Sequence, residues 1–472
     1  MGNLQIQASF IDSVEVFLNQ AVGIVWGPPL VVLLVGAGLS LSIALGIVQI
    51  KGFKHAIDVI RGKFDDPNDP GEINHFQALC TALSATIGLG NIAGVAIAIS
   101  FGGPGAVFWM IVVGLVGMAT KFSECSLALM YRHVDDRGEV HGGPMYYIER
   151  GLGKAWKPMA VFFAVACLFA TFGASNMFQT YEVATLMNSQ FQIPNYVTGL
   201  VLAVLTGIVI IGGIKRIGSV TSKVVPIMGL IYIVGSLIVI LSNASAVPEL
   251  LLMIIDSAFN GTAATGGFAG AGVATVITWG VRRACFSNEA GVGSSPIAHS
   301  AAATKEPVRE GAVALLEPFI DTVVVCTMTA LVILISGAWT DAVDPVTGNK
   351  LTGALLTAKA FDSAIPGFGK FFVPVAVFLF AYSTLLSWSY YGERALDYLT
   401  GGKGIVVYKF IFCTVAFIGA MWTQKVIISF SDLMYGLMVI PNMLAIAILS
   451  PKLLKESKSY FQRLKAGEFE VK

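Results

Sequence analysis

The first residues that could do chemistry form a short polar run inside an apolar stretch. Residues 79–100 are LCTALSATIGLGNIAGVAIAIS, with Gly88 and Gly90 on either side of one leucine. Glycine costs about 1 kcal/mol relative to alanine in a helix interior, so this segment favours an interrupted helix. The first half of such a helix ends in free carbonyl groups and the second half begins with free N–H groups. These ends suit a cation and an anion, so together they fit a sodium ion and a zwitterion.

A simpler interpretation of these glycines is also open. With Gly94, they could merely let two helices pack closely, and this stretch alone does not decide between the alternatives. Broken backbone is tolerated at membrane depth only where protein or a water-filled cavity surrounds it. The interpretation therefore depends on a second feature of the sequence.

A second stretch carries the same anomaly. Residues 282–296 are RRACFSNEAGVGSSP, which does not fit a plain helix facing lipid. A cytoplasmic loop is the alternative, but a loop would leave the preceding span, which begins near 271, too short to cross a membrane. We therefore predict a second interrupted helix at Ser287–Gly291.

The composition requires a membrane around both segments. Of the 472 residues 55% are hydrophobic and only 12% are charged, whereas soluble proteins carry about 25% charged residues. Lipid is therefore the expected solvent of this chain, and its formal net charge of +1 argues against a nucleic-acid partner. The first 20 residues show no cleaved signal peptide.

A spanning helix needs about 20 mostly apolar residues, and this criterion gives about eleven candidates. They are 26–50, 77–101, 104–131, 157–187, 195–213, 219–242, 271–303, 311–338, 368–391, 405–421 and 426–449. A shorter apolar segment at 351–365 is expected to lie as a helix on the outer surface. The predicted fold class is an all-α integral membrane protein with a single transmembrane domain over 1–472.

Lys and Arg are concentrated in alternate loops and in the tail at 450–472. The opposite loops carry few, among them Lys350, Lys359 and Lys425. Because cytoplasmic loops hold an excess of Lys and Arg, we expect a multi-pass protein with its N-terminus outside and its C-terminus in the cytoplasm.

The two anomalous segments stand at matching positions. If the helix at 26–50 stands apart, the other candidates form two sets of five, at 77–242 and 271–449, and each set begins with an anomalous segment. An odd number of spans makes the sets inverted relative to each other. Inverted repeats with paired broken helices are typical of secondary transporters that bind substrate and ion near the midplane of the membrane.

Four motifs, in order along the chain, resemble the alanine/glycine:cation symporter family of the amino acid–polyamine–organocation superfamily. They are NHFQALCTALSATIGLGNIAG at 74–94, GGPMYYIERG at 142–151, FSNEAGVGSSPIAHSA at 286–301 and SWSYYGER at 387–394. The resemblance implies the LeuT-type fold of five plus five inverted helices with two discontinuous helices, here preceded by one extra helix. It also implies uptake of alanine or glycine, driven by sodium or protons, across a prokaryotic plasma membrane.

The two interrupted helices and the resemblance together give each candidate residue an expected role. The backbone N–H groups of Gly88–Gly90 would hold the substrate carboxylate, and the carbonyls of Ser84 and Phe286, with Asn288, would hold its ammonium group. The expected substrate contacts are Ser84, Ile87, Gly88, Leu89, Gly90, Gln179, Phe286, Asn288, Thr384 and Trp388. A sodium ion is expected among the carbonyls and hydroxyls of Ser84, Ile87, Ser383 and Thr384.

Two of these side chains have alternative interpretations. Gln179 could donate to the substrate carboxylate or make an interhelical hydrogen bond, which is worth about 0.6 kcal/mol on average. Trp388 shares a helix face with Thr384 and could limit the pocket to small side chains, or it could serve in packing or interfacial anchoring.

Charged groups inside spans are functional candidates. Lys121 and Glu124 lie three residues apart and are expected to pair, whereas Asp321 has no obvious partner in the sequence. The histidines are too scattered along the chain to predict a metal site; they are His55, His75, His133, His141 and His299.

Glu289 lies within the second anomalous segment. It could carry a proton if transport is coupled to protons. We expect instead that it caps a half-helix or pairs with Arg282 or Arg283.

Other classes of function fit less well. A channel needs a continuous lining rather than paired half-helix sites, and a membrane enzyme needs a nucleophile or metal cluster, of which the sequence offers none with usable spacing. The sequence leaves open whether alanine, glycine, serine or glutamine is the substrate, as well as the stoichiometry and the oligomeric state.

Overall fold

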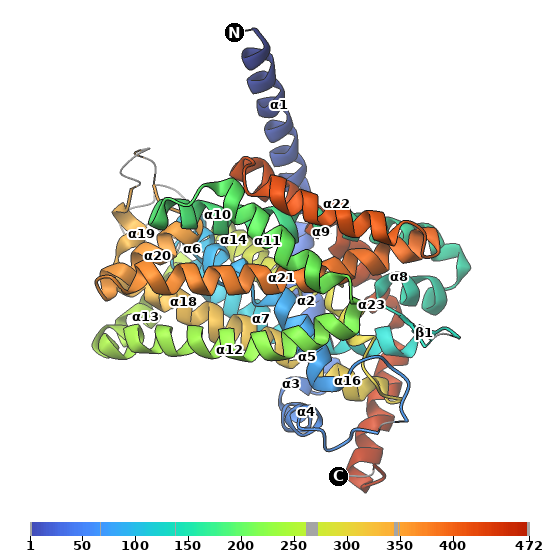
Figure 1. Ribbon diagram of the computed structural model, residues 1–472. Coiled ribbons are helices and arrows are strands. Elements are labelled where there is room, and N and C mark those ends of the chain that lie inside the picture. The colour runs from blue at the N-terminus through green and yellow to red at the C-terminus, as the bar shows by residue number, and fades with distance from the viewer. Residues whose placement is uncertain are drawn as a thin grey trace.

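The computed structural model describes residues 2–66, 68–136, 138–260, 272–343, 348 and 350–469, with side chains described from residue 13 onward. This part of the chain is mostly helical, and its two ends lie on opposite sides of the bundle (Figure 1). The expected start of a span at residue 271 and the end of the expected tail, 470–472, lie outside the described residues.

The helices of the first half, in chain order, are interrupted by one hairpin. The elements are α1 (Gly2–Val25), α2 (Pro28–Ala44), α3 (Val48–Lys51), α4 (Phe53–Ile60), α5 (His75–Thr86), the π-helical turn η1 (Gly90–Gly94), α6 (Val95–Gly102), α7 (Gly105–Met130), β1 (His133–Val134), β2 (Val140–His141), α8 (Pro144–Tyr146), η2 (Tyr147–Gly151), η3 (Lys154–Trp156), α9 (Lys157–Phe172), η4 (Gly173–Met177), α10 (Phe178–Phe191), α11 (Asn195–Ile210), α12 (Gly213–Ser242), η5 (Ala244–Ala246) and α13 (Val247–Asn260).

The second half is helical in the part that the structure describes. Its elements are α14 (Val273–Asn288), α15 (Ser295–His299), α16 (Pro307–Ala314), α17 (Leu316–Pro318), the π-helical segment η7 (Phe319–Cys326), α18 (Thr327–Ser336), α19 (Ala338–Asp341), α20 (Gly353–Ala364), α21 (Phe368–Thr400), α22 (Ile405–Gly419) and α23 (Gln424–Ala466).

Many of these helices are suited to a bilayer. Among the described residues, 6 helices are long and apolar enough to cross a membrane, or up to 8 if each of two bent pairs forms one span. The outer face of α12 exposes large apolar side chains such as Ile227 (57%) and Leu230 (64%), which lipid can cover. The chain is therefore a multi-pass membrane protein. The count is lower than the expected eleven because short helices and breaks divide several of the expected segments.

Two shorter helices lie outside the expected spans. The sequence did not predict α13, whereas α20 lies within the segment 351–365, where a helix was expected. Its expected place on the outer surface stays a prediction. One face of α20, including Leu356 and Phe361, is buried against α18 and α21. Thr357 Oγ1 donates to the carbonyl of Ile92 at 3.0 Å, so α20 is bound to the segment that follows the first glycine run.

The first expected span, 26–50, is divided differently. Helix α1 precedes it, and α1 and α2 form a pair bent by 43°. Trp26 lies at the bend, and its Nε1 donates to the carbonyl of Asp432 at 2.8 Å. At the other end, α2 stops at Ala44 because Gly46 (φ 66°) and Ile47 (φ 57°) adopt left-handed conformations.

Helix α21 is the central element for the candidate site. It packs against α5, α9, α12 and α20, and side chains on every face of its middle part, from Ser383 to Ala395, are buried. Figure 1 shows α21 crossing the bundle. This helix therefore carries its polar side chains into the interior of the protein.

The hairpin of β1 and β2 is attached to the end of α21. His141 Nδ1 lies 2.8 Å from Asp397 Oδ2, and this hydrogen bond raises the pKa of His141 above its usual value of 6.5. The charged imidazole therefore helps to hold the hairpin on the helix.

We expect the hairpin to open more readily as the pH rises. Because the pKa of His141 is raised in the folded protein, its contribution to stability is fully present below pH about 6.5 and is lost as the pH rises through the raised pKa. Hydrogen exchange at Val140 and His141, corrected for intrinsic rates, should show weaker protection at pH 9 than at pH 6. The variant His141→Gln should remove this difference, and a difference that persists in the variant would contradict the assignment.

Candidate functional site

The first glycine run interrupts its helix. Helix α5 ends at Thr86, η1 begins at Gly90, and the two halves are bent by 47°. The N–H of Gly88 would bond to the carbonyl of Ser84 in a continuous helix, but it bonds instead to the carbonyl of Thr86 at 2.8 Å and to Asn91 Oδ1 at 2.9 Å. The carbonyl of Ser84 is thereby released from its own helix.

Helix α21 supplies polar groups to this released carbonyl. The hydroxyls of Thr384 and Ser383 lie 3.1 Å and 3.5 Å from the carbonyl oxygen of Ser84, and Ser84 Oγ donates to the carbonyl of Ser383 at 2.5 Å. The structure thus brings together three of the four residues expected to bind sodium. The fourth, Ile87, is buried at the end of α5.

The other N–H group of this break already has a partner. Leu89 donates its N–H to Gln179 Oε1 at 3.2 Å, and Gln179 Nε2 donates to the carbonyl of Ala174 at 3.2 Å. In this structure Gln179 therefore makes an interhelical hydrogen bond to the break itself.

Glycine is needed at both ends of the run. A Cβ atom at Gly88 would lie 2.5 Å from Thr384 Oγ1, and a Cβ atom at Gly90 would lie 2.9 Å from Ser287 Cα. The first break therefore packs directly against α21 and against the backbone of α14. The packing interpretation and the break interpretation of these glycines both hold.

The second anomalous stretch is also irregular. Helix α14 ends at Asn288, and α15 begins only at Ser295. Between them Glu289, Gly291 and Gly293 have φ values of 57°, 88° and 85°. A left-handed conformation costs a non-glycine residue energy, so Glu289 is held by its surroundings.

One local side chain and two from distant helices satisfy the backbone of this second break. Asn288 Oδ1 accepts from the N–H of Ala290 at 2.9 Å, and Glu124 Oε1 accepts from the N–H of Gly291 at 3.0 Å. Asn442 Nδ2 donates to the carbonyl of Gly291 at 2.8 Å. Asn288, expected near the substrate ammonium group, is therefore already engaged, and its Nδ2 donates to Thr322 Oγ1 at 2.9 Å.

Asp321 links the two breaks, which the sequence did not predict. Asn91 Nδ2 donates to Asp321 Oδ1 at 2.6 Å, and Ser287 Oγ donates to Asp321 Oδ2 at 2.9 Å. Asn91 follows the first break and Ser287 precedes the second. The expectation that Asp321 has no obvious partner reflected only that these partners are far away along the chain.

Aromatic side chains surround the same region. Phe286 contacts Phe178 and Tyr435, each with ring centroids 5.2 Å apart. Trp388 is buried, stacks on Tyr435 with centroids 5.4 Å apart, and donates its Nε1 to Glu289 Oε1 at 2.8 Å. Trp388 therefore joins α21 to the second break rather than anchoring the helix at an interface.

The expected pairing of Glu289 with Arg282 or Arg283 is wrong. Both arginines bind the carboxylate of Asp432 on α23, whereas Glu289 accepts hydrogen bonds from Trp388 and from the hydroxyl of Ser294. The arginines follow the face of α14 toward α23, and the left-handed turn at Glu289 directs its side chain elsewhere.

The expected pair of Lys121 with Glu124 is also wrong. Lys121 Nζ lies 3.4 Å from Glu317 Oε2, and Glu124 accepts from Asn442 Nδ2 at 2.5 Å and from Gly291. A spacing of three residues allows Lys121 and Glu124 to pair, but each side chain binds a buried partner on another element instead.

Two of the histidines are close together, although they are far apart in the sequence. His75 and His299 both bind the carboxylate of Glu310, and His299 Nε2 lies 2.8 Å from Glu317 Oε1. Both nitrogens of His299 are thus occupied by carboxylates. These groups continue through Glu317 to Lys121 as a buried ionic network that joins α5, α7, α15, α16 and α17.

Comparison with known proteins places the chain among transporters. The model of the "Sodium:alanine symporter family" matches residues 11–472. The sodium/alanine symporter AgcS of Methanococcus maripaludis is 46% identical, over 94% of this chain and 96% of that protein. An uncharacterized transporter of Haemophilus influenzae is 43% identical, over 97% of this chain and 98% of that protein.

A solved structure extends the likeness to the fold. The substrate-bound outward-open state of a Na⁺-coupled sialic acid symporter aligns with a TM-score of 0.53 and 14% identity, over 89% of this chain and 87% of that chain. This match supports the expected LeuT-type arrangement of helices, and at this identity it concerns the fold alone.

We expect Gly90→Ala to destabilise the protein because the added methyl group would lie 2.9 Å from Ser287 Cα, where backbone meets backbone. Overpacking of this kind costs about 1–3 kcal/mol. The unfolding temperature of the purified protein should fall. The matched control is Gly229→Ala in α12, where a Cβ atom meets nothing within 4 Å and alanine favours the helix. Equal effects of the two substitutions would contradict the close approach of the two breaks.

Proposed function

Because the chain belongs to the sodium:alanine symporter family, we propose that it couples sodium entry to the uptake of a small neutral amino acid by alternating access. Alanine and glycine are the first candidate substrates. The family description and the name of the 46% identical relative support this choice.

One observation carries the proposal. The carbonyl of Ser84, released by the break in its helix, lies 3.1 Å and 3.5 Å from the hydroxyls of Thr384 and Ser383. Unwound carbonyls at the end of a half-helix are typical sodium ligands in secondary transporters. We therefore assign the sodium site to these oxygens together with the carbonyl of Ile87.

The substrate would bind on the other side of the same break. Its carboxylate would take the N–H groups of Gly88–Gly90, and it would replace the side-chain oxygens of Asn91 and Gln179 that now accept from Gly88 and Leu89. Its ammonium group would lie at the carbonyls of Ser84 and Phe286. The substrate thus exchanges one set of acceptors for another and leaves no N–H group unpaired.

The proposed architecture is the five-plus-five inverted repeat. The repeats span 77–242 and 271–449, each beginning with a discontinuous helix, and the helix at 26–50 is additional. We further propose eleven spans in a cell membrane, with the N-terminus outside, since Lys and Arg gather in the loops assigned to the cytoplasm.

Proton coupling is the second candidate, and Glu289 favours it. This buried carboxyl group accepts from Trp388 and Ser294, and in the part of the chain that the structure describes it makes no ion pair. Uptake of labelled alanine into proteoliposomes separates the candidates: a sodium gradient without a pH gradient should drive it, and a pH gradient alone should not.

We expect Thr384→Ala to weaken sodium dependence, because it removes one proposed ligand. The sodium concentration for half-maximal uptake should rise about tenfold, which corresponds to ~1.4 kcal/mol. Thr384→Ser should restore the parent value. The control Ser389→Ala removes a hydroxyl whose one hydrogen bond among the described residues is to the carbonyl of Leu386 in its own helix. Unchanged sodium dependence in Thr384→Ala would remove this residue from the site.

We expect Trp388→Leu to widen the range of substrates. The indole ring is buried and stacks on Tyr435, which in turn contacts Phe286, so a smaller side chain leaves space near the proposed substrate position. Leucine should then compete with labelled alanine at least ten times better than in the parent protein, as measured by inhibition of uptake. The exposed Trp422, changed to leucine, is the control. A substrate range that stays fixed would show that Trp388 only packs.

A further inference from the structure

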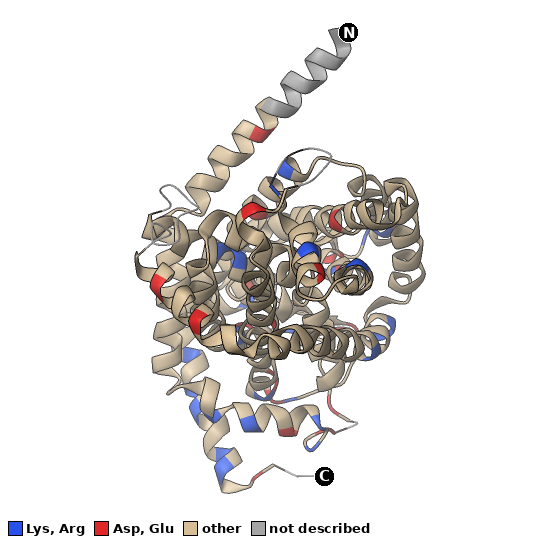
Figure 2. Ribbon diagram, turned by 90° about the vertical axis from the view of Figure 1, so that its left-hand side faces the viewer, with Lys and Arg blue, Asp and Glu red and all other residues tan. Residues whose placement is uncertain are grey.

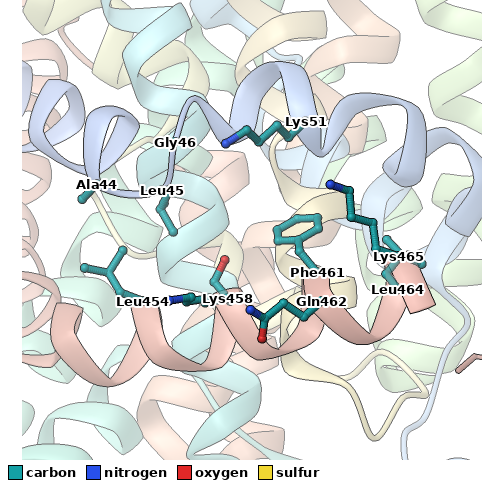
Figure 3. Close-up of a pocket in the computed structure, with 11 residues that line it drawn as sticks. Ala44, Leu45, Gly46, Lys51, Leu454, Lys458, Phe461, Gln462, Leu464 and Lys465 are labelled. Carbon is teal, nitrogen blue, oxygen red and sulfur yellow. The ribbon is translucent and has the colours of Figure 1, made fainter. Parts of the chain in front are cut away.

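A basic pocket lies apart from the candidate site, between the C-terminal part of α23 and the turn that joins α2 to α3 (Figure 3). Its volume is ≈ 790 Å³. We define the basic pocket by the residues that carry the argument, which are Leu45, Lys51, Leu454, Lys458, Phe461 and Lys465.

The wall on α23 is one face of the helix. Leu454, Lys458, Phe461 and Lys465 are spaced by three or four residues, so their side chains lie on the same side. A neighbouring face is buried in the protein, where Tyr460 bonds to His55 at 2.7 Å. The end of α23 is therefore fixed in place by its buried face, and its basic face remains exposed.

The opposite wall is a strained turn. Gly46 and Ile47 follow α2 in left-handed conformations, which are costly for a β-branched residue such as isoleucine. The turn brings Lys51 back over Gly46, where any larger residue would collide with Lys51 Nζ. Strain of this kind persists only where the surrounding structure imposes it.

The basic pocket carries positive charge without a counter-charge. Its three lysines are exposed, no carboxylate lines it, and among the described residues none of the three forms an ion pair. Figure 3 shows their ammonium groups on both walls, and Figure 2 shows Lys and Arg gathered around the same end of the chain. An anion that contacts both walls would relieve the repulsion among the lysines.

An apolar groove lies on the same turn. It has a volume of ≈ 370 Å³ and is lined mainly by apolar side chains, among them Leu39, Ile43, Ile50 and Leu115. Ile43 and Ile50 are 69% and 75% exposed, which suits hydrocarbon rather than water. The turn between α2 and α3 therefore carries a basic pocket and an apolar groove.

We propose that the basic pocket binds the phosphodiester headgroup of an anionic phospholipid whose acyl chains cover the apolar groove. Basic pockets beside membrane helices recognise such headgroups. A free phosphate ion would use the lysines but not the groove. A zwitterionic lipid would bring its own ammonium group against three lysines. The bound lipid would brace the end of α23 against α2.

The first experiment measures the unfolding temperature of the full chain in detergent with added lipid. Phosphatidylglycerol should raise it by about 2–5 °C more than phosphatidylcholine at the same concentration, because a ligand that binds only the folded state stabilises it. Equal shifts with the two lipids would overturn the proposal. An equal shift with inorganic phosphate would also overturn it, since the site would then be one for free anions.

Two matched double variants locate the effect. Lys458→Gln with Lys465→Gln removes two charges from the basic pocket, and Lys54→Gln with Lys455→Gln removes two exposed charges outside it. The pocket variant should lose the preference for phosphatidylglycerol and the control should keep it. If both double variants lose the preference for phosphatidylglycerol, the lipid is attracted by the charged surface in general. If the pocket variant keeps the preference, the basic pocket is not the site. Either result overturns the proposal.

A second measurement remains informative if a variant is poorly stable. The amount of phosphatidylglycerol that stays with the parent protein through a detergent wash should be at least one molecule per chain. A further wash that contains excess phosphatidylcholine and no phosphatidylglycerol should lower this amount for the pocket variant and leave it unchanged for the parent protein. Parent protein that retains no phosphatidylglycerol would overturn the proposal without reference to any variant.

Discussion

The rest of this structure depends on the need to satisfy main-chain groups where two helices stop inside the bundle. A buried N–H or carbonyl group without a partner costs about 1–3 kcal/mol, and lipid offers no water to replace it. Gln179, Asn91 and Glu124 meet this need by accepting from N–H groups at the two breaks. Because these side chains come from different elements, their hydrogen bonds to the breaks also join those elements to one another.

The buried charges follow from the same constraint. Glu124 and Asp321 lie in the interior because their oxygens accept from groups at or beside the breaks, and Asp321 joins both. The network from His75 through Glu310 and His299 lies next to them. Such groups are costly to bury, so each of them depends on the hydrogen-bond or ionic partners that the neighbouring helices supply.

The sequence predicts local features of this fold well and distant partners poorly. The break at Gly88–Gly90 was predictable only together with the second anomalous stretch, because paired broken helices at matching positions are typical of secondary transporters. The meeting of Thr384 with Ser84 followed from the resemblance to a family. The partners of Lys121 and Asp321 were not predictable, since they depend on which helices are neighbours in space. The i, i+3 spacing of Lys121 and Glu124 suggested a local pair, and tertiary contacts overrode it.

The hydroxyl of Thr384 shows how ion binding can reach beyond its site in the proposed mechanism. It lies 3.1 Å from the carbonyl of Ser84 and 3.0 Å from the carbonyl of Phe380, but a hydroxyl donates only one hydrogen. A sodium ion at Ser84 would turn that hydrogen toward Phe380, leaving the lone pairs of the hydroxyl to the ion. Helices α5 and α21 would then be joined by the ion instead of by a hydrogen bond. Sodium would thus set the position of α21, which carries the proposed substrate contact Trp388, relative to α5, which leads into the break at Gly88.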